Sequence, residues 1–212
     1  MANLKEENKL ALAGLMGTPL LLTLVLQVGL EESKGFLDYA MAAGFSALAT
    51  VVLVMLADVL PQSLKHKLVF LRLWHELPGY RCHQLCFSDA RLDREELVDA
   101  WPHVFGNEVE KSDRNRLWYK HIYKDVMEKP QVRSAHKRFL LYRDSCAGTL
   151  VVLLTLILWT TTGLDVPHLG LLHPWAISIQ GGFLMLLLLS AQSNGKRMVV
   201  NATVTKLSID SE

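Results

Sequence analysis

Four stretches of this 212-residue chain contain no charged side chain, and this absence decides its class. They are residues 10–30, 39–57, 146–164 and 175–192. An α-helix needs about 20 apolar residues, within a range of about 17–25, to cross the hydrocarbon core of a bilayer, and each stretch fits that range. A soluble domain of this length seldom holds four such runs. We therefore predict an all-α integral membrane protein with four transmembrane helices.

The absence of charge inside these stretches also bears on function. Proton-coupled and ion-coupled transporters place ionisable groups within their spans, so the sequence disfavours that class. The first stretch lacks an A-x-A-like cleavage site, and its 21 uncharged residues exceed the apolar region of about 7–15 residues in a signal peptide. We therefore expect it to remain as a spanning helix.

Cysteine is scarce, and catalytic motifs are missing. Three cysteines are too few for a disulfide framework. The sequence contains no G-x-S-x-G, Walker or H-E-x-x-H motif, and nothing in it indicates a cofactor. The sequence contains one possible metal-binding motif, but it is incomplete. Structural zinc sites need four ligands, and the second ligand pair is missing. We expect buried thiols and a surface histidine rather than a metal site at the four candidate residues: His75, Cys82, His83 and Cys86.

Basic residues are concentrated in one central stretch. Of the 22 lysines and arginines, 16 lie between Lys65 and Arg143, whereas loop 31–38 contains only Lys34 and loop 165–174 contains none. Because basic flanks stay on the cytoplasmic side, we predict that both termini and the central insert are cytoplasmic. The predicted organisation is two spans in residues 1–60, a cytoplasmic helical domain in 61–145, two spans in 146–192 and a cytoplasmic tail in 193–212.

The apolar pattern of the insert predicts short helices that share a core. We expect helices over 64–77, after Asp93 in a capping box, and over 114–128. The final helix of the insert leads into the third span without a turn signal, so the insert and the spans are expected to be continuous. The predicted core of the insert consists of Trp101, Trp118, Ile122, Val126 and Phe139.

Small residues recur along the second span, where they predict a packing seam. Such residues let helix backbones approach closely in lipid. The partner is either the first span or another subunit, and we expect a homo-oligomer. The predicted seam comprises Ala40, Gly44, Ser46 and Ala47.

Two arginines precede His121 at spacings that resemble the arginine–histidine motif of HEPN ribonucleases. In that family the arginine and histidine act on the RNA backbone, so the resemblance implies catalytic roles for Arg114, Arg116 and His121. The insert holds nine arginines and six histidines, so about two such matches arise by chance. The modest basic excess favours a face beside anionic lipid headgroups over a nucleic-acid surface.

The segments LPGYRCHQLCFSDARLD (77–93) and NRLWYKHIYKDVMEKPQVRSAHKRFLLYRD (115–144) resemble a pattern in small bacterial inner-membrane proteins. That family combines two spans, a helical cytoplasmic insert and two further spans, and it implies no activity. The architecture is also similar to that of membrane subunits of bacterial anti-phage defence systems.

The sequence favours a non-enzymatic protein of the bacterial inner membrane. We expect its insert to bind a cytoplasmic protein partner or another cytoplasmic signal. The insert would pass that signal to the bilayer, as in a membrane-perturbing or pore-forming effector or sensor subunit of a defence system. A membrane-tethered HEPN-like ribonuclease is the alternative, and a small transporter or channel is the third hypothesis.

Overall fold

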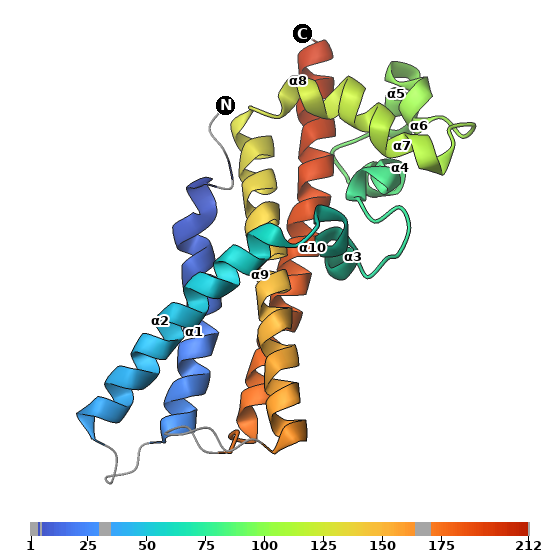
Figure 1. Cartoon of the computed structure of the whole chain (residues 1–212). Helices are drawn as coiled ribbons and strands as arrows, with labels where there is room; N and C mark the ends of the chain where they lie inside the picture. The colour runs from blue at the N-terminus through green and yellow to red at the C-terminus, as the bar shows by residue number, and fades with distance from the viewer. Residues whose placement is uncertain (1–3, 5, 30–34, 164–170, 212) are drawn as a thin grey trace. The chain divides into compact units, whose positions relative to one another are not determined.

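The computed structural model describes residues 4, 6–29, 35–163 and 171–211, and within them it contains helices and turns but no strand (Figure 1). Four helices are long and apolar enough to cross a membrane: Glu6–Gln27, Tyr39–Leu56, Pro130–Thr162 and Trp175–Asp210. The predicted all-α class with four spanning helices and a helical region between the second and third is confirmed. The two predicted outer loops, 31–38 and 165–174, lie partly outside the described residues.

The elements follow one another in this order: η1 (Glu6–Asn8), α1 (Lys9–Val28), α2 (Phe36–Val59), α3 (Gln62–Phe70), η2 (Pro78–Arg81), α4 (Cys82–Phe87), α5 (Arg94–Ala100), α6 (Pro102–Phe105), α7 (Lys111–Trp118), η3 (Tyr119–Tyr123), α8 (Lys124–Val126), α9 (Pro130–Thr162) and α10 (Trp175–Asp210). They form two compact units. The first unit comprises Met1–Lys65 and Leu141–Leu189, and the second comprises His66–Leu140 and Ser190–Glu212.

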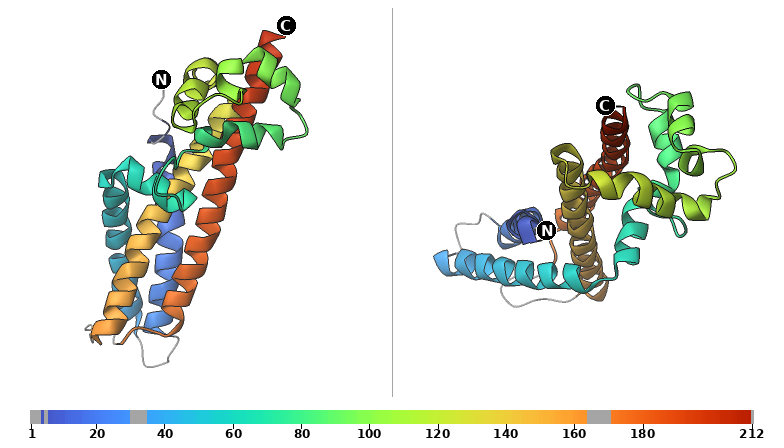
Figure 2. Two further views of the ribbon diagram at one scale, coloured as in Figure 1. Left: turned by 90° about the vertical axis from the view of Figure 1, so that its right-hand side faces the viewer. Right: turned by 90° about the horizontal axis from the view of Figure 1, so that it is seen from above.

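Within the first unit, α1 packs against α2, α9 and α10 (Figure 2). A Cβ atom on Gly148 of α9 would collide with the side chain of Met16, which is 2% exposed. From α10, Gln180 donates a hydrogen bond to the hydroxyl of Thr23 at 3.1 Å. Uncharged polar pairs of this kind join helices in lipid, where no water competes for the bond.

In the structure, one residue of the predicted seam on α2 is buried and the other three are exposed. Ser46 is buried. One turn further along α2, Thr50 lies against Gly17 of α1, and a Cβ atom built on Gly17 would be 3.2 Å from the Thr50 hydroxyl oxygen. In contrast, Ala40, Gly44 and Ala47 are exposed, and nothing lies within 4 Å of a Cβ built on Gly44.

A buried group of charges joins the start of α3 to α9 in the first unit. The ammonium of Lys65, whose side chain is 1% exposed, lies 3.3 Å from the carboxylate of Asp144. Arg143 contacts the same carboxylate at 2.8 Å and is 3% exposed. Removing such charges from water costs several kcal/mol per ion unless they are paired, so this contact fixes the neighbouring helices with respect to each other.

The second unit is built around the last part of α10. Its core combines residues of the short helices with the successive α10 residues Met198, Val199 and Val200. The tail is thus the last part of a helix that begins at Trp175. The predicted continuity of the insert with the third span is also present, because α9 runs without interruption from Pro130 to Thr162.

Local signals explain most of the short elements. The carboxylate of Asp93 accepts hydrogen bonds from the amides of Glu95 and Glu96, which caps α5 as predicted. The helix predicted over 64–77 is shorter, because α3 ends at Phe70. Leu71 and His75 have φ angles of 51°, a left-handed conformation that ends a helix and is unfavourable for residues with a side chain.

The helix predicted over 114–128 begins earlier and is irregular. It starts at Lys111 and passes through a π-helical segment, Tyr119–Tyr123, before α8. Such π segments are rare in helices and are frequent at functional sites.

Candidate anion-binding site

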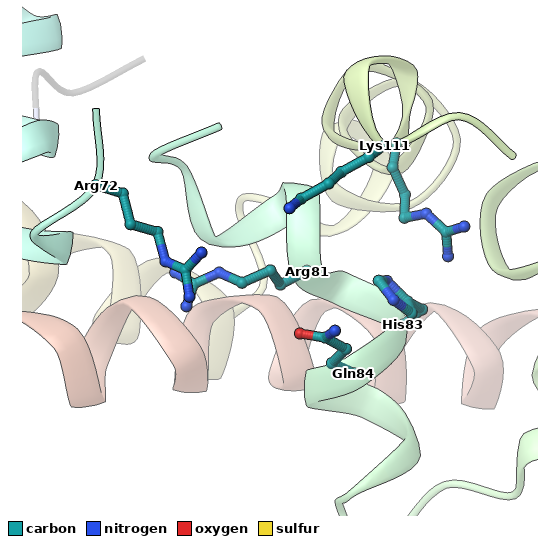
Figure 3. A pocket seen from close by; sticks show the side chains of 6 residues that line it. Arg72, Arg81, His83, Gln84 and Lys111 are labelled. Atoms are coloured by element: carbon teal, nitrogen blue, oxygen red, sulfur yellow. The ribbon is translucent and has the colours of Figure 1, made fainter. Parts of the chain in front are cut away.

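A basic pocket in the second unit is the most distinctive polar feature of the molecule (Figure 3). It has a volume of about 230 Å³. Arg72 and Arg81 extend toward one another in Figure 3, and Lys111 extends from α7 toward the same space. The loop after α3, η2, α4 and the start of α7 contribute the lining residues: Arg72, Arg81, His83, Gln84, Lys111 and Arg114.

The turn at η2 brings the walls of the pocket together. Gly79 is buried against α7, and a Cβ atom at this position would collide with the Asn115 side chain and lie 2.9 Å from the Trp118 ring. Because glycine allows this close approach, α7 packs directly on η2. Arg81, two residues after Gly79, is thereby placed opposite the first turns of α7.

Arg114 forms the inner wall and is 6% exposed. Its Nη2 atom donates hydrogen bonds to the carbonyls of Val109 at 2.9 Å and Gly106 at 3.3 Å. These bonds hold the turn before α7 and occupy one end of the guanidinium group. Arg114 is also one of the residues that line the pocket.

Several nitrogens around the pocket are buried and unpartnered. Within the described part of the chain, the Arg81 Nε and Nη2 atoms, His83 Nδ1 and Arg114 Nε have no hydrogen-bond partner. Leaving a buried donor unsatisfied costs about 1–3 kcal/mol, and more when the group is charged. These four atoms belong to three residues that line the pocket, so they are costly in the structure unless a hydrogen-bond partner reaches them.

The charges of the lining residues also favour an anion in the pocket. Among the described residues that line it there are four permanent cations and no carboxylate. Burial lowers the pKa of Arg81, and the neighbouring Arg72 lowers it further. Burial likewise lowers the pKa of His83, assisted by Arg114 and Lys111, so the imidazole is neutral at pH 7 and can donate or accept a hydrogen bond.

This combination of groups is suited to an oxyanion. Guanidinium groups bind phosphate and carboxylate in a bidentate manner, and lysine contributes a further charged donor. The volume of about 230 Å³ lies below the range of about 300–1,000 Å³ for drug-sized ligands. The pocket therefore fits a small anion or the anionic end of a larger molecule.

One hydroxyl group of α10 forms hydrogen bonds with both helices that carry most of the pocket residues. Thr203 receives a hydrogen bond from the Cys86 thiol of α4 at 3.4 Å and another from the Trp118 indole of α7 at 3.4 Å, and it donates to the Val199 carbonyl. Helices α4 and α7 carry four of the six lining residues. A change in their spacing therefore acts on α10 at Thr203.

The residues of the incomplete metal motif are separated. Cys82 and Cys86 are fully buried in the core, and burial raises the pKa of both thiols to about 12. His83 lines the basic pocket, whereas the His75 ring packs edge-on against Tyr80. Within the described ranges, no three His, Cys, Asp or Glu side chains gather as a metal would require.

The three residues of the ribonuclease hypothesis make different contacts. Arg114 lies in the pocket wall, while Arg116 is exposed and pairs with Asp113 at 2.9 Å. The His121 ring lies edge-on to His103, with 4.3 Å between ring centroids, and burial, followed by His103, lowers its pKa.

The residues expected in the core of the insert are all buried in the structure: Trp101, Trp118, Ile122, Val126 and Phe139. In contrast, the sequence analysis did not identify Arg72, Arg81, Gln84 and Lys111 as site residues. No spacing or motif unites them, because they come from three separate elements and one loop. The available sequence signal was the Pro78-Gly79 pair, which marks a tight turn and ends two residues before Arg81.

A second hollow, of about 560 Å³, lies in the first unit and is lined mainly by leucine, valine and alanine of α1, α2 and α9. A surface of this kind between membrane helices suits hydrocarbon chains. It presents no group of charged side chains.

Comparison of the chain with known protein families, curated proteins and solved structures found no match. Its function is therefore argued from the site itself. The structure supports a helical protein with four candidate membrane-spanning helices, and no family is identified for it.

Proposed function

We propose that this chain is a non-enzymatic membrane sensor whose insert binds an oxyanion and passes the binding event to its membrane helices. The observation that carries the proposal is that three residues lining the basic pocket, Arg81, His83 and Arg114, hold four buried nitrogens without a hydrogen-bond partner. An anion that accepts hydrogen bonds from them is held only when η2, α4 and α7 are correctly placed. Binding thus favours one arrangement of these elements over others.

The route to the membrane passes through α10. Thr203, which α4 and α7 share, belongs to the helix that starts at Trp175. A single helix transmits displacement along its axis because its hydrogen-bonded backbone is stiff. The output would be a change in the packing of the spans, as in a membrane-perturbing effector or sensor subunit of a bacterial defence system.

In this proposal the chain spans the bacterial inner membrane and its insert lies in the cytoplasm. The concentration of basic residues in the insert supports the cytoplasmic position. We further propose a homo-oligomer, supported by the exposed small residues of α2 such as Gly44, which allow close helix approach in lipid. A strictly monomeric protein in detergent and in bilayers would remove the oligomer from the proposal.

The first test is calorimetric titration of sulfate into the full-length protein in detergent, at constant ionic strength. Sulfate keeps both charges across neutral pH and contains no group that a hydrolase would cleave. Lys111→Gln should weaken binding about tenfold or more. Lys120→Gln is the matched control, because Lys120 is also exposed but does not line the pocket.

The second test concerns transmission. Hydrogen exchange of α9 and α10 amides is compared with and without sulfate, in the wild type and in Thr203→Val. We expect sulfate to alter exchange in the spans of the wild type, and the variant to bind sulfate while losing that response. If neither protein binds sulfate, the proposed function is wrong.

A further inference from the structure

The loop that follows α3 carries the most exposed large apolar side chains described in the second unit. Leu71, Leu73 and Trp74 are 72%, 66% and 76% exposed. They lie within four consecutive residues, whereas single exposed apolar residues are scattered on most protein surfaces. A cluster of this kind indicates an interaction surface.

The loop is held in place by its two ends. Phe70 stacks on Phe139 with 5.8 Å between centroids, and the Arg81 guanidinium lies 5.5 Å above the Phe70 ring. At the other end, His75 packs edge-on against Tyr80 at 4.9 Å. The apolar side chains therefore project from a fixed base.

The backbone conformation of the loop is unfavourable in the isolated chain. Leu71 and His75 both have left-handed φ angles of 51°, which cost non-glycine residues roughly 1–2 kcal/mol each. The side chain of Leu71 is nevertheless mostly exposed, so little burial within the protein offsets this cost. Burial in an external apolar phase would compensate for it.

We propose that residues 71–74 insert into the bilayer interface, so that the basic pocket binds the phosphate of an anionic lipid headgroup. This inference rests on the proposed function and names the source of its anion. Arg72 connects the two features, because it stands between the exposed leucines and also lines the pocket. Tryptophan and leucine insert at the headgroup level, and basic pockets beside spans hold anionic headgroups.

The length of the chain keeps the loop close to the membrane. Helix α3 has nine residues and begins at Gln62, soon after α2 ends at Val59. With 1.5 Å per helical residue and up to about 3.6 Å per residue elsewhere, Leu71 at the start of the loop lies no farther than roughly 26 Å from the end of α2. Soluble anions reach the pocket without such a loop, so the exposed apolar side chains favour a lipid as the source.

Insertion is tested with an environment-sensitive NBD fluorophore at Trp74→Cys, in full-length protein reconstituted into nanodiscs containing phosphatidylglycerol. The native thiols are buried and react slowly, so the new cysteine is labelled selectively. The emission should shift to the blue and be quenched by doxyl-labelled lipids. Glu108→Cys is the matched control, since Glu108 is exposed on another loop of the same unit, and it should show neither effect.

The source of the anion is tested by counting retained phosphatidylglycerol in native mass spectra. The double variant Arg72→Gln/Arg81→Gln should retain at least about tenfold less lipid than the control Arg116→Gln/Lys120→Gln. The inference would be overturned if the emission of the probe at Trp74→Cys did not shift. It would also be overturned if the emission shifted but doxyl lipids did not quench it, because a second copy of the chain would then cover the loop. Equal lipid retention with undiminished sulfate binding would also overturn it, while leaving the proposed function intact.

Discussion

Arg81→Gln is the substitution that best separates a binding pocket from a structural cluster of cations. In the ligand-free protein, Arg81 has two buried nitrogens without a partner, and burial together with Arg72 lowers its pKa. Removing the charge relieves about 1–3 kcal/mol of unsatisfied polarity. It also removes the stacking on Phe70, which contributes about 0.5–1 kcal/mol.

The ligand-free variant is therefore expected to be as stable as the wild type or slightly more stable. The effect on binding has the opposite sign. A hydrogen bond to a charged group contributes about 1.5–3 kcal/mol, so the sulfate dissociation constant should rise roughly 10- to 150-fold in Arg81→Gln.

Both quantities are measured by thermal unfolding of the detergent-solubilised protein across a sulfate series, with chloride replaced at constant ionic strength. A ligand that binds only the folded state raises Tm with concentration, so the wild-type series should rise and the variant series should remain nearly flat. Arg116→Gln is the control, because that side chain is 71% exposed and outside the pocket. A large loss of stability in ligand-free Arg81→Gln, with an unchanged sulfate response, would refute the reasoning.

Four further predictions concern the same unit. Sulfate should bind more tightly as the pH falls below about 6.5, because burial lowers the pKa of His83 and a bound anion raises it; titrations of His83→Gln should lack this increase. For the same reason the ligand-free protein should lose stability as the pH falls from the unfolded-state pKa of histidine to the lower folded-state pKa, measured by Tm. Gly79→Ala should lower Tm and weaken sulfate binding, because its Cβ meets Asn115; Gly181→Ala, in open space, is the control. Thr203→Val should weaken the attachment of α4 and α7 to α10, seen as faster amide exchange there, and Thr203→Ser should restore it.

The fold was largely predictable because its strongest signals are local. Uninterrupted apolar runs identify the spans, and a capping carboxylate such as Asp93 identifies a helix start. The end of α3 was mispredicted because Leu71 and Trp74 continue the apolar spacing of a helix while lying in a loop. Apolar periodicity indicates burial only when the apolar side chains face the protein.

The pocket was beyond the reach of sequence patterns for a different reason. Arg81 and Lys111 are brought together by the contact of η2 with α7, and that contact depends on Gly79. Charged residues in a polar insert are normally solvated, so their number alone distinguishes no binding site. The site is revealed by which nitrogens are buried without a partner, which is a property of the packed structure.

The buried contact between Lys65 and Asp144 has a consequence for biogenesis. The ribosome releases Lys65 well before the carboxylate that neutralises it, so this ammonium must stay hydrated until α9 arrives. An ion pair that loses one member costs about 3–5 kcal/mol when buried. Chains truncated before α9 would therefore leave a hydrated cation at the start of α3, and the first unit could not close around Lys65 until the carboxylate of Asp144 is present.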